Sequence, residues 1–421
     1  MTVRQLSSEG PRALLTDPAV SRILSMLNSK TEETRIVGGS VRDALLGSDN
    51  SDIDLATTLL PNEVMRRAAT TSLKAIPTGI DHGTVTILLG RRTFEVTTLR
   101  EDIETDGRHA VVRFGRSFAR DAERRDFTIN ALSLDEDGKV HDTVGGMADL
   151  SAGRVRFIGD AATRIREDAL RILRFFRFHA RYGIGEPDKD GVRSAISAAA
   201  TLDGLSRERV RSEALKLLEA PRAVAVIAAM RDAGLLDRII QTGGYLDRLD
   251  RACRADGLAS PTAPIERLAA LAVDSRADIE RLRRTLRLSN EETYVLETYA
   301  DARQDLEHLA EVATVDMRRL AATRNLHGVA LAIDVMDDLR KRRISREALT
   351  VLDHFLDGTD PIPVLPVSGR DLVAMDIPPG RSIGAGLAAA HSLWLQRGCA
   401  SGEKEKAFLL QYILAAIGPK A

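Results

Sequence analysis

From about residue 34 to 150 the chain alternates apolar and polar residues with the two-residue period of β-strands. Six short segments fit this pattern and are bounded by Gly, Asp or Asn: RIVGG, DIDLA, GTVTILLG, RTFEVTTL, ALSLD and RVRFIG. After about residue 160 apolar residues recur at helical spacing, as in 162–183, 207–220 and 221–236. The pattern predicts an α+β fold, in which a small mixed sheet is followed by an all-helical remainder.

Gly and Pro cluster in two later stretches, DGLASPTAP at 256–264 and DGTDPIPVLPVSGRD at 357–371. Such clusters are typical of loops between helical blocks. We therefore divide the chain into a head of residues 1–150, a helical neck of residues 151–220, and a helical body and tail of residues 221–421.

Composition narrows the class of protein only slightly. The chain has 421 residues and a formal net charge of −1, so any basic surface must be local. Cys253 and Cys399 are far apart and lack metal-ligand spacing, which argues against a disulfide framework and suits a reducing compartment. The segment MTVRQLSSEGPRALL lacks the apolar stretch expected of a signal peptide, and no uninterrupted apolar run approaches bilayer length. We expect a cytoplasmic protein with no membrane partner.

The segment SDIDLAT (51–57) places two acidic residues on one face of a predicted strand. Asp52, Asp54 and Ala56 share that face, while Ile53 and Leu55 point to the core. Two adjacent carboxylates repel each other unless a cation lies between them. A divalent cation with a preference for oxygen ligands, such as Mg²⁺, resolves that repulsion.

A third carboxylate would complete a two-metal arrangement for phosphoryl chemistry. Glu95 is the best candidate, because it lies on another predicted strand with Phe94 and Val96 on the opposite face. The sequence leaves open the alternative that Glu95 is a solvated strand residue. We expect Asp52, Asp54 and Glu95 to be the catalytic and metal-binding residues.

Glycines precede these aspartates in a strand–turn–helix order. Gly38 and Gly39 follow the strand RIV and precede SVRDALLG, so backbone N–H groups and a helix N-terminus would face an anion. Arg42 adds a positive charge for the same phosphate, and Gly47 would end the short helix. Together with the paired aspartates, these residues predict metal-assisted nucleotidyl transfer.

Six ordered blocks and a tail segment extend this pattern over nearly the whole chain. They are GGSVRD…LLG…DIDLAT, FEVTTLRED…DGRHAVV, RRDFTINAL, HDTVGGMADL, REDALRILRFFRF, SRERVRSEALKLL and, in the tail, PVSGRDLVAMDIPPGRSIG. With these blocks the chain resembles the bacterial CCA-adding tRNA nucleotidyltransferases of the class II nucleotidyltransferase superfamily. That superfamily also contains the bacterial poly(A) polymerases.

The resemblance implies a reaction and its partners. It implies Mg²⁺ in the catalytic head, and template-independent addition of CMP, CMP and AMP from CTP and ATP to the 3′ end of tRNA. The neck would select the base, the body and tail would bind tRNA, and the protein would be a monomer or homodimer. The block RRDFTINAL implies that Arg125, Asp126 and Asn130 contact ribose and triphosphate, although an exposed turn is the alternative for each.

Base selection can be argued from the first neck segment when residues 164–180 are treated as one helix. Its core face would carry Ile165, Ala169, Ile172, Leu173, Phe176 and Ala180, and its polar face Arg164, Glu167, Asp168, Arg171, Arg174 and Phe178. An ionised Asp only accepts hydrogen bonds and an Arg only donates them. Asp168 and Arg171 therefore match the pairing edges of cytosine and adenine and mismatch uracil and guanine. An intrahelical salt bridge between them is the alternative.

Other activities of related chemistry stay open. A poly(A) polymerase shares the head residues, although ATTLLPNEVMRR after the aspartates lacks the block expected of the bacterial members. An enzyme that adds only CC or only A, and a non-catalytic RNA-binding relative, are further alternatives. The stretch 100–121 resembles the flexible loop that full CCA addition requires.

Overall fold

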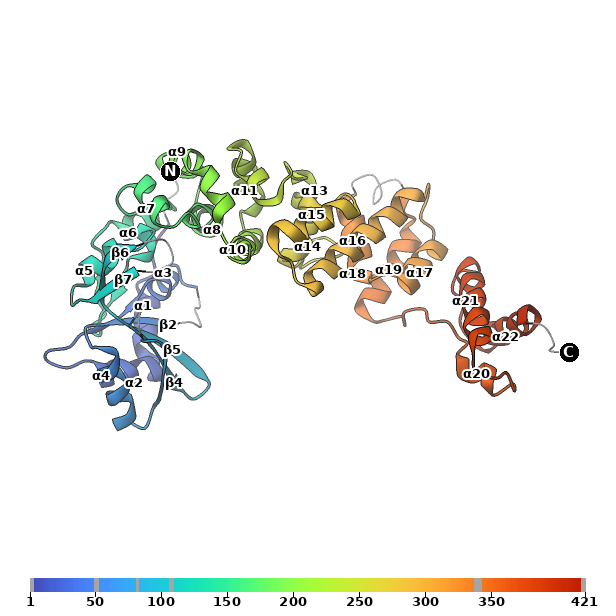
Figure 1. Cartoon of the computed structure of the whole chain (residues 1–421), viewed down its shortest axis with the longest axis horizontal. Helices are drawn as coiled ribbons and strands as arrows, with labels where there is room; N and C mark the ends of the chain where they lie inside the picture. The colour runs from blue at the N-terminus through green and yellow to red at the C-terminus, as the bar shows by residue number, and fades with distance from the viewer. Residues whose placement is uncertain (1–3, 49–52, 81–82, 106–109, 337–342, 418–421) are drawn as a thin grey trace. The chain divides into compact units, whose positions relative to one another are not determined.

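The computed structural model describes residues 4–48, 53–80, 83–105, 110–336 and 343–417. The chain divides into two compact units, Met1–Ile239 and Ile240–Ala421. Strands occur in the first unit, and the described residues of the second are organised by helices (Figure 1). This arrangement confirms the predicted α+β fold class.

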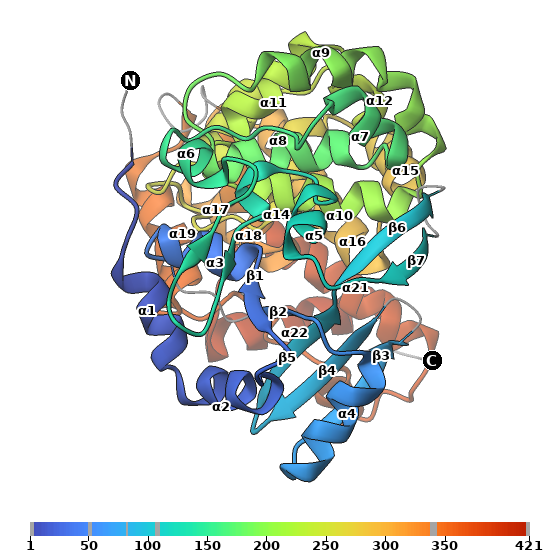
Figure 2. The ribbon, with the colours of Figure 1, turned by 90° about the vertical axis from the view of Figure 1, so that its left-hand side faces the viewer.

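A mixed sheet of seven strands organises the first unit. Its order is β3-β4-β5-β2-β1-β8-β9, and β2 and β5 are parallel while the other neighbours are antiparallel. The strands are β1 (Thr34–Val37), β2 (Ile53–Thr57), β3 (Lys74–Gly79), β4 (Thr84–Leu89), β5 (Arg92–Thr98), β8 (Ser133–Leu134) and β9 (Val140–His141). Helices α2 (Pro18–Leu27) and α4 (Pro61–Thr70) pack against this sheet (Figure 2).

The stretch that resembles a flexible loop contains regular structure. Strands β6 (Arg100–Thr105) and β7 (Ala110–Phe114) form a separate antiparallel ribbon, which is followed by α5 (Phe118–Glu123). The backbone N–H of Leu99 donates to the Thr57 carbonyl oxygen, and the N–H of Gly115 donates to the Leu99 carbonyl oxygen. These two hydrogen bonds hold the base of the ribbon against the large sheet. Residues 106–109 lie outside the described part.

The segment RVRFIG forms no strand, which corrects that prediction. Phe157 instead makes an isolated bridge with Phe127, and both rings enter an aromatic cluster. The ring centroids of Phe127 lie 4.9 Å from Phe157 and 5.2 Å from Phe178. Phe127 is fully buried. Because edge and tilted aromatic contacts add to area burial, this cluster fixes the RRDFTINAL block against the helix that carries Phe178, α8 (Arg171–Tyr182).

The predicted continuous helix over 164–180 is also wrong. It divides into α7 (Ala161–Glu167) and α8 (Arg171–Tyr182), with Asp168 in an extended conformation at φ −153° and ψ 109°. The Asp168 Oδ1 atom accepts a hydrogen bond from the backbone N–H of Leu170 at 3.0 Å. Such a local turn competes with helix continuation. Phe178, which we expected on the polar face, is buried, whereas Ala169 on the expected core face is half-buried.

The remaining helices complete both units. In the first unit they are α1 (Glu9–Thr16), α3 (Gly39–Leu45), α6 (Gly146–Ser151), α9 (Lys189–Ser197), α10 (Arg207–Glu219) and α11 (Ala223–Asp232), with α12 (Leu236–Ile240) at the boundary. In the second they are α13 (Leu246–Ala252), α14 (Pro264–Ala272), α15 (Arg276–Leu286), α16 (Asn290–His308), α17 (Thr314–Thr323), α18 (Leu326–Val335), α19 (Arg346–Asp357), α20 (Gly369–Val373), α21 (Arg381–Gln396) and α22 (Glu403–Ile417). Among the described helices, none is long and apolar enough to cross a membrane.

Candidate active site

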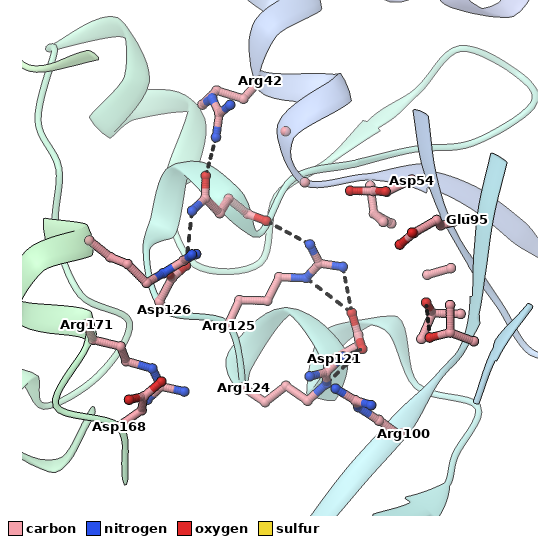
Figure 3. Close-up of a pocket in the computed structure, with 18 of the residues that line it drawn as sticks. Arg42, Asp54, Glu95, Arg100, Asp121, Arg124, Arg125, Asp126, Asp168 and Arg171 are labelled. Atoms are coloured by element: carbon pink, nitrogen blue, oxygen red, sulfur yellow. Dashed lines mark hydrogen bonds and ion pairs between the residues drawn. The ribbon is translucent and has the colours of Figure 1, made fainter. Parts of the chain in front are cut away.

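One pocket of about 630 Å³ in the first unit collects the predicted site residues (Figure 3). Every predicted residue that the structure describes lines it: Gly38, Gly39, Arg42, Asp54, Glu95, Arg125, Asp126, Asn130, Asp168, Arg171 and Arg174. Asp52 lies outside the described residues. The sequence therefore predicted a set that the fold brings together from the sheet, the turn after β1, the RRDFTINAL block and the α7–α8 junction.

Asp54 and Glu95 form the acidic part of the pocket. They are register partners on the parallel strands β2 and β5, and both are exposed. Their strand neighbours point to the opposite face and are buried: Ile53, Leu55, Phe94 and Val96. This alternation confirms the predicted strand faces.

The acidic pair fits a hard divalent cation. Like charges directly opposite on neighbouring strands are destabilising, and a cation between them removes that cost. Asp54 and Glu95 supply only oxygen ligands, which is the donor type that Mg²⁺ and similar cations prefer. Within the described ranges no three His, Cys, Asp or Glu side chains gather around one point, so a third ligand would have to come from elsewhere, such as Asp52.

Gly38 occupies a position that a side chain would not fit. Its φ is +69°, and a Cβ atom there would lie 2.7 Å from the Arg125 Nη1 atom. The same Arg125 atom donates to the carbonyl oxygen of Asn130 at 3.1 Å. Glycine is therefore favoured by the backbone conformation, and a side chain there would also displace the Arg125 guanidinium from its contact with Asn130.

A chain of buried and partly buried polar contacts runs from the head to α8. Both Nε and Nη2 of Arg174 donate to Asp126 Oδ2, at 2.8 and 2.6 Å. Asp126 Oδ1 accepts from Asn130 Nδ2 at 3.0 Å, and Asn130 Oδ1 accepts from Arg42 Nη1 at 2.5 Å. Arg42 Nη2 then donates to the Tyr182 hydroxyl at 2.6 Å.

This network changes the expectation for Arg42. Its guanidinium is buried, stacks on the Tyr182 ring with Cζ 4.1 Å from the centroid, and also donates from Nε to Asp43 at 2.8 Å. In the structure Arg42 joins α3 to α8 at the wall of the pocket. Its predicted contact with phosphate stays a prediction.

Asp121 is a site residue that the sequence analysis missed. It is buried on α5 and pairs with Arg124 at 2.6 Å and with Arg125 at 3.1 Å. Burial alone would raise the pKa of this carboxyl, but the guanidiniums of Arg125 and Arg124 hold the pKa below its usual range. The spacings of three and four residues were the signal that could have found it.

The Asp168–Arg171 couple has different partners from those expected. Asp168 Oδ2 accepts from Arg209 Nη2 at 2.6 Å, and Arg209, which lies on α10, also lines the pocket. Arg171 pairs with Glu167 and donates from Nη1 to the Arg164 carbonyl oxygen at 2.9 Å. Within the described contacts, the two side chains thus take separate partners rather than an intrahelical salt bridge. No local spacing in the sequence indicated the partnership with Arg209.

The partly buried Asp126–Arg174 pair generates a stability prediction. Burial by itself raises the pKa of Asp126, but Arg174, Asn130 and the Phe127 N–H outweigh it and lower the pKa. A lowered folded-state pKa stabilises the protein above the unfolded value of about 3.9 and loses that effect as pH falls through the folded value. Asp126→Asn should therefore lower the free energy of unfolding at pH 7 by about 1–3 kcal/mol, the range for a charge-assisted contact that is only partly buried. Urea unfolding at pH 7 and at pH 3 should show this difference shrinking at low pH.

The matched control is Asp232→Asn, which removes an exposed pair with Arg231 at 3.1 Å. It should cost less than about 1 kcal/mol. An equal, small effect of both substitutions at pH 7 would contradict the importance of the partly buried pair.

Gly38→Ala should destabilise the protein by about 1–3 kcal/mol through the strained backbone, and further by displacing Arg125. Gly47→Ala is a suitable control, because Gly47 has φ +70° and its Cβ would meet nothing within 4 Å. Denaturant unfolding of the two variants measures the combined cost of the Gly38 backbone conformation, at φ +69° and ψ −122°, and of the Arg125 contact. Equal losses of unfolding free energy in both would show that neither feature makes Gly38 more demanding than Gly47.

Two family models match parts of the chain. Residues 34–156 match the poly A polymerase head domain, and residues 189–242 match the probable RNA and SrmB-binding site of polymerase A. Relatives of known identity extend the similarity. The mitochondrial CCA tRNA nucleotidyltransferase 1 of Danio rerio is 34% identical over 402 residues, covering 93% of this chain and 89% of its own.

A CCA-adding enzyme of Streptococcus sanguinis is 40% identical over 231 residues, which is 54% of this chain and 57% of that enzyme. Among solved structures, the Bacillus stearothermophilus CCA-adding enzyme in complex with CTP matches with a TM-score of 0.70 at 27% identity, over 93% of this chain and 95% of that one. The Thermotoga maritima CCA-adding enzyme complexed with tRNA shares the fold at a TM-score of 0.70 and 19% identity, over 99% of this chain and all of that one (100%). The chain belongs to the CCA tRNA nucleotidyltransferase family.

Proposed function

We propose that this protein adds CMP, CMP and AMP in turn to the 3′ end of tRNA, taking them from CTP and ATP without a nucleic-acid template. One observation carries the proposal. A single pocket holds the register-paired carboxylates Asp54 and Glu95 at one end and the acceptor–donor couple Asp168 and Arg171 at the other. The first pair suits phosphoryl chemistry and the second suits recognition of a base.

The reaction joins the tRNA 3′ oxygen to the α-phosphorus of the nucleotide and breaks the bond from that phosphorus to the pyrophosphate oxygen. The hydroxyl proton passes to a carboxylate oxygen of Asp54 or Glu95 as the new bond forms. Nucleotidyltransferases of this family use a divalent metal, and we take it to be Mg²⁺, held by Asp52, Asp54 and Glu95. When bound, that ion neutralises charge on the attacking and leaving oxygens.

The triphosphate would lie between the carboxylates and the arginines of the RRDFTINAL block. Gly38 leaves room for the Arg125 guanidinium beside the turn after β1, and Gly39 borders the same space. Arg125 is also held by Asp121, so its position is fixed before the nucleotide arrives. A charge that is already oriented needs little reorganisation when it binds phosphate.

Base choice would rest on which hydrogen-bond groups the neck presents. Asp168 accepts from Leu170 and Arg209 and, as a carboxylate with about four lone-pair positions, can still accept from an amino group. Cytosine and adenine carry that amino group beside a ring nitrogen that Arg171 can reach as donor. Uracil and guanine instead present a carbonyl acceptor beside a ring N–H donor. The carbonyl would then face the acceptor Asp168, and the N–H would face the donor Arg171.

The remaining assignments follow the same family type. We propose a catalytic head, a base-selecting neck and a tRNA-binding body and tail with the boundaries given above, in a monomer or homodimer. We propose that the enzyme is bacterial and that it is located in the cytoplasm. The free cysteines Cys253 and Cys399 support a reducing compartment.

The reaction is tested by incubating the protein with a tRNA transcript that lacks its 3′ CCA, with Mg²⁺ and each nucleoside triphosphate alone and together. Sequencing of the product end should show C, C and A added once each. Poly(A) polymerase activity would instead give a long tail when ATP is supplied to a tRNA ending in CC. A partial enzyme would stop after CC or would need CC to begin.

Base selection is tested by Asp168→Ala and Arg171→Ala. Because a bidentate base contact contributes about 1–3 kcal/mol of discrimination, each variant should lower the CTP-to-UTP ratio of kcat/KM by about 10-fold or more. Steady-state kinetics with a CCA-less tRNA measures it. Asp232→Ala, on the exposed α11 pair, should leave the ratio unchanged. Unaltered rejection of UTP in both neck variants would remove these two residues from base selection.

A further inference from the structure

We propose that Arg100, together with the hydroxyl groups of Thr84 and Thr97, binds the phosphate and ribose of the last nucleotide of the tRNA acceptor strand. This inference rests on the proposed function, because it concerns the second substrate of the same pocket. It gives individual roles to Thr84, Thr97 and Arg100, of which only Arg100 belongs to the stretch 100–121 that resembles a flexible loop.

The three side chains continue the catalytic wall of the sheet. Thr97 lies two residues after Glu95 on β5, so both point to the same face with a separation of about 7 Å along the strand. Thr84 on β4 is the register partner of Thr97, and their hydroxyl oxygens lie 3.1 Å apart. Arg100 begins β6, and all three line the pocket that contains Asp54 and Glu95.

The position of Arg100 is fixed by the backbone around it. Leu99 is buried, its N–H donates to the Thr57 carbonyl oxygen at 2.8 Å, and its own carbonyl oxygen accepts from Gly115 at 2.7 Å. The ribbon therefore starts from an anchored point on the sheet. Figure 3 shows Arg100 below Glu95 and near Arg124, away from Asp168 and Arg171.

The geometry of nucleotidyl transfer makes this end of the pocket suitable for the acceptor. In the proposed function the incoming base would occupy the neck side, and its triphosphate would lead from there towards the carboxylates. In-line displacement requires the attacking 3′ oxygen to approach from the side opposite the departing pyrophosphate. The wall beyond Glu95, formed by the threonines and Arg100, is where the nucleotide that carries that oxygen can lie.

The polar groups of this wall suit the sugar and phosphate of the terminal nucleotide, which stay the same at every addition. The terminal base differs at successive additions, because the strand first ends in its own last nucleotide and then in C and CC. Only the sugar and the phosphate are the same each time. Contacts from arginine and from hydroxyl groups to phosphate and ribose carry no base information, and Arg100, Thr84 and Thr97 provide only such groups here.

The experiment compares two acceptor minihelices that differ in one charge. One has a normal 3′-terminal linkage, and the other has an uncharged methylphosphonate between its last two nucleotides. Wild-type protein should show a KM for the neutral acceptor about 10-fold above that for the normal one, as expected for loss of one charge-assisted contact. Arg100→Ala should show a similarly raised KM for the normal acceptor and no further increase for the neutral one. Its Kd for a non-hydrolysable CTP analogue, measured by titration without acceptor, should equal that of wild type.

Three further variants test whether the raised KM of Arg100→Ala has a cause other than the loss of the phosphate contact. Arg91→Ala removes an exposed arginine on the β4–β5 turn, outside the pocket, and should keep the wild-type response to the neutral linkage. Arg100→Lys keeps the charge and should retain part of that response, which a merely unfolded variant could not do. Thr97→Val removes a hydroxyl with little change of shape and should raise the acceptor KM alone.

The outcomes separate this inference from the proposed function. A wild-type protein that adds no nucleotide to either acceptor would refute the proposed function itself. An active wild type with an Arg100→Ala variant that remains equally sensitive to the neutral linkage would refute the acceptor assignment. A weakened Kd for the CTP analogue, with the acceptor KM unchanged, would place Arg100 on the incoming triphosphate instead.

Discussion

The partly buried ion pair between Asp126 and Arg174 is the interaction on which the site depends. Asp126 lies between α5 and the short turn Thr128–Asn130, and Arg174 lies in the first turn of α8. Removing either partner would leave a partly buried charge without its partner, which costs more than an exposed pair contributes. The pair therefore holds α8 at one position relative to the sheet, and with it the preceding α7–α8 junction.

That constraint matters because the two proposed chemical functions lie on different elements. The carboxylates Asp54 and Glu95 are fixed by strand register, whereas Asp168 and Arg171 are fixed by a turn between helices. The Arg42–Asn130 contact and the Phe127 cluster add two further connections across the same gap. An enzyme without a nucleic-acid template must recognise the base with protein groups that lie at a constant distance from the reacting phosphorus. The contacts described above keep α8 and the sheet at such a fixed distance.

The periodicity of apolar residues predicted correctly which strand residues face the core and which are exposed. The two-residue period placed Asp54 and Glu95 on the exposed face and Phe94 and Val96 in the core, because face alternation is a property of any strand. The helical period over 164–180 failed at Asp168, because a side-chain bond to the Leu170 N–H competes with the helix and leaves no trace in hydrophobic spacing. Arg209 reaches Asp168 from 41 residues away, and no single-sequence spacing encodes such a pair.

Arg42 shows how the sequence can identify a residue of the pocket and still miss part of what its side chain does. Its type and its place after two glycines indicated a phosphate contact, yet its guanidinium is buried against Tyr182 and bound to Asp43 and Asn130. Arginine has five donors in a rigid plane, so one side chain can connect several elements at once. Arg42 is one of the arginines that line the pocket, and its contacts connect α3 to α8. Positioning and recognition are thus not alternatives here, since the groups that orient the walls also supply the field in which an anionic substrate binds.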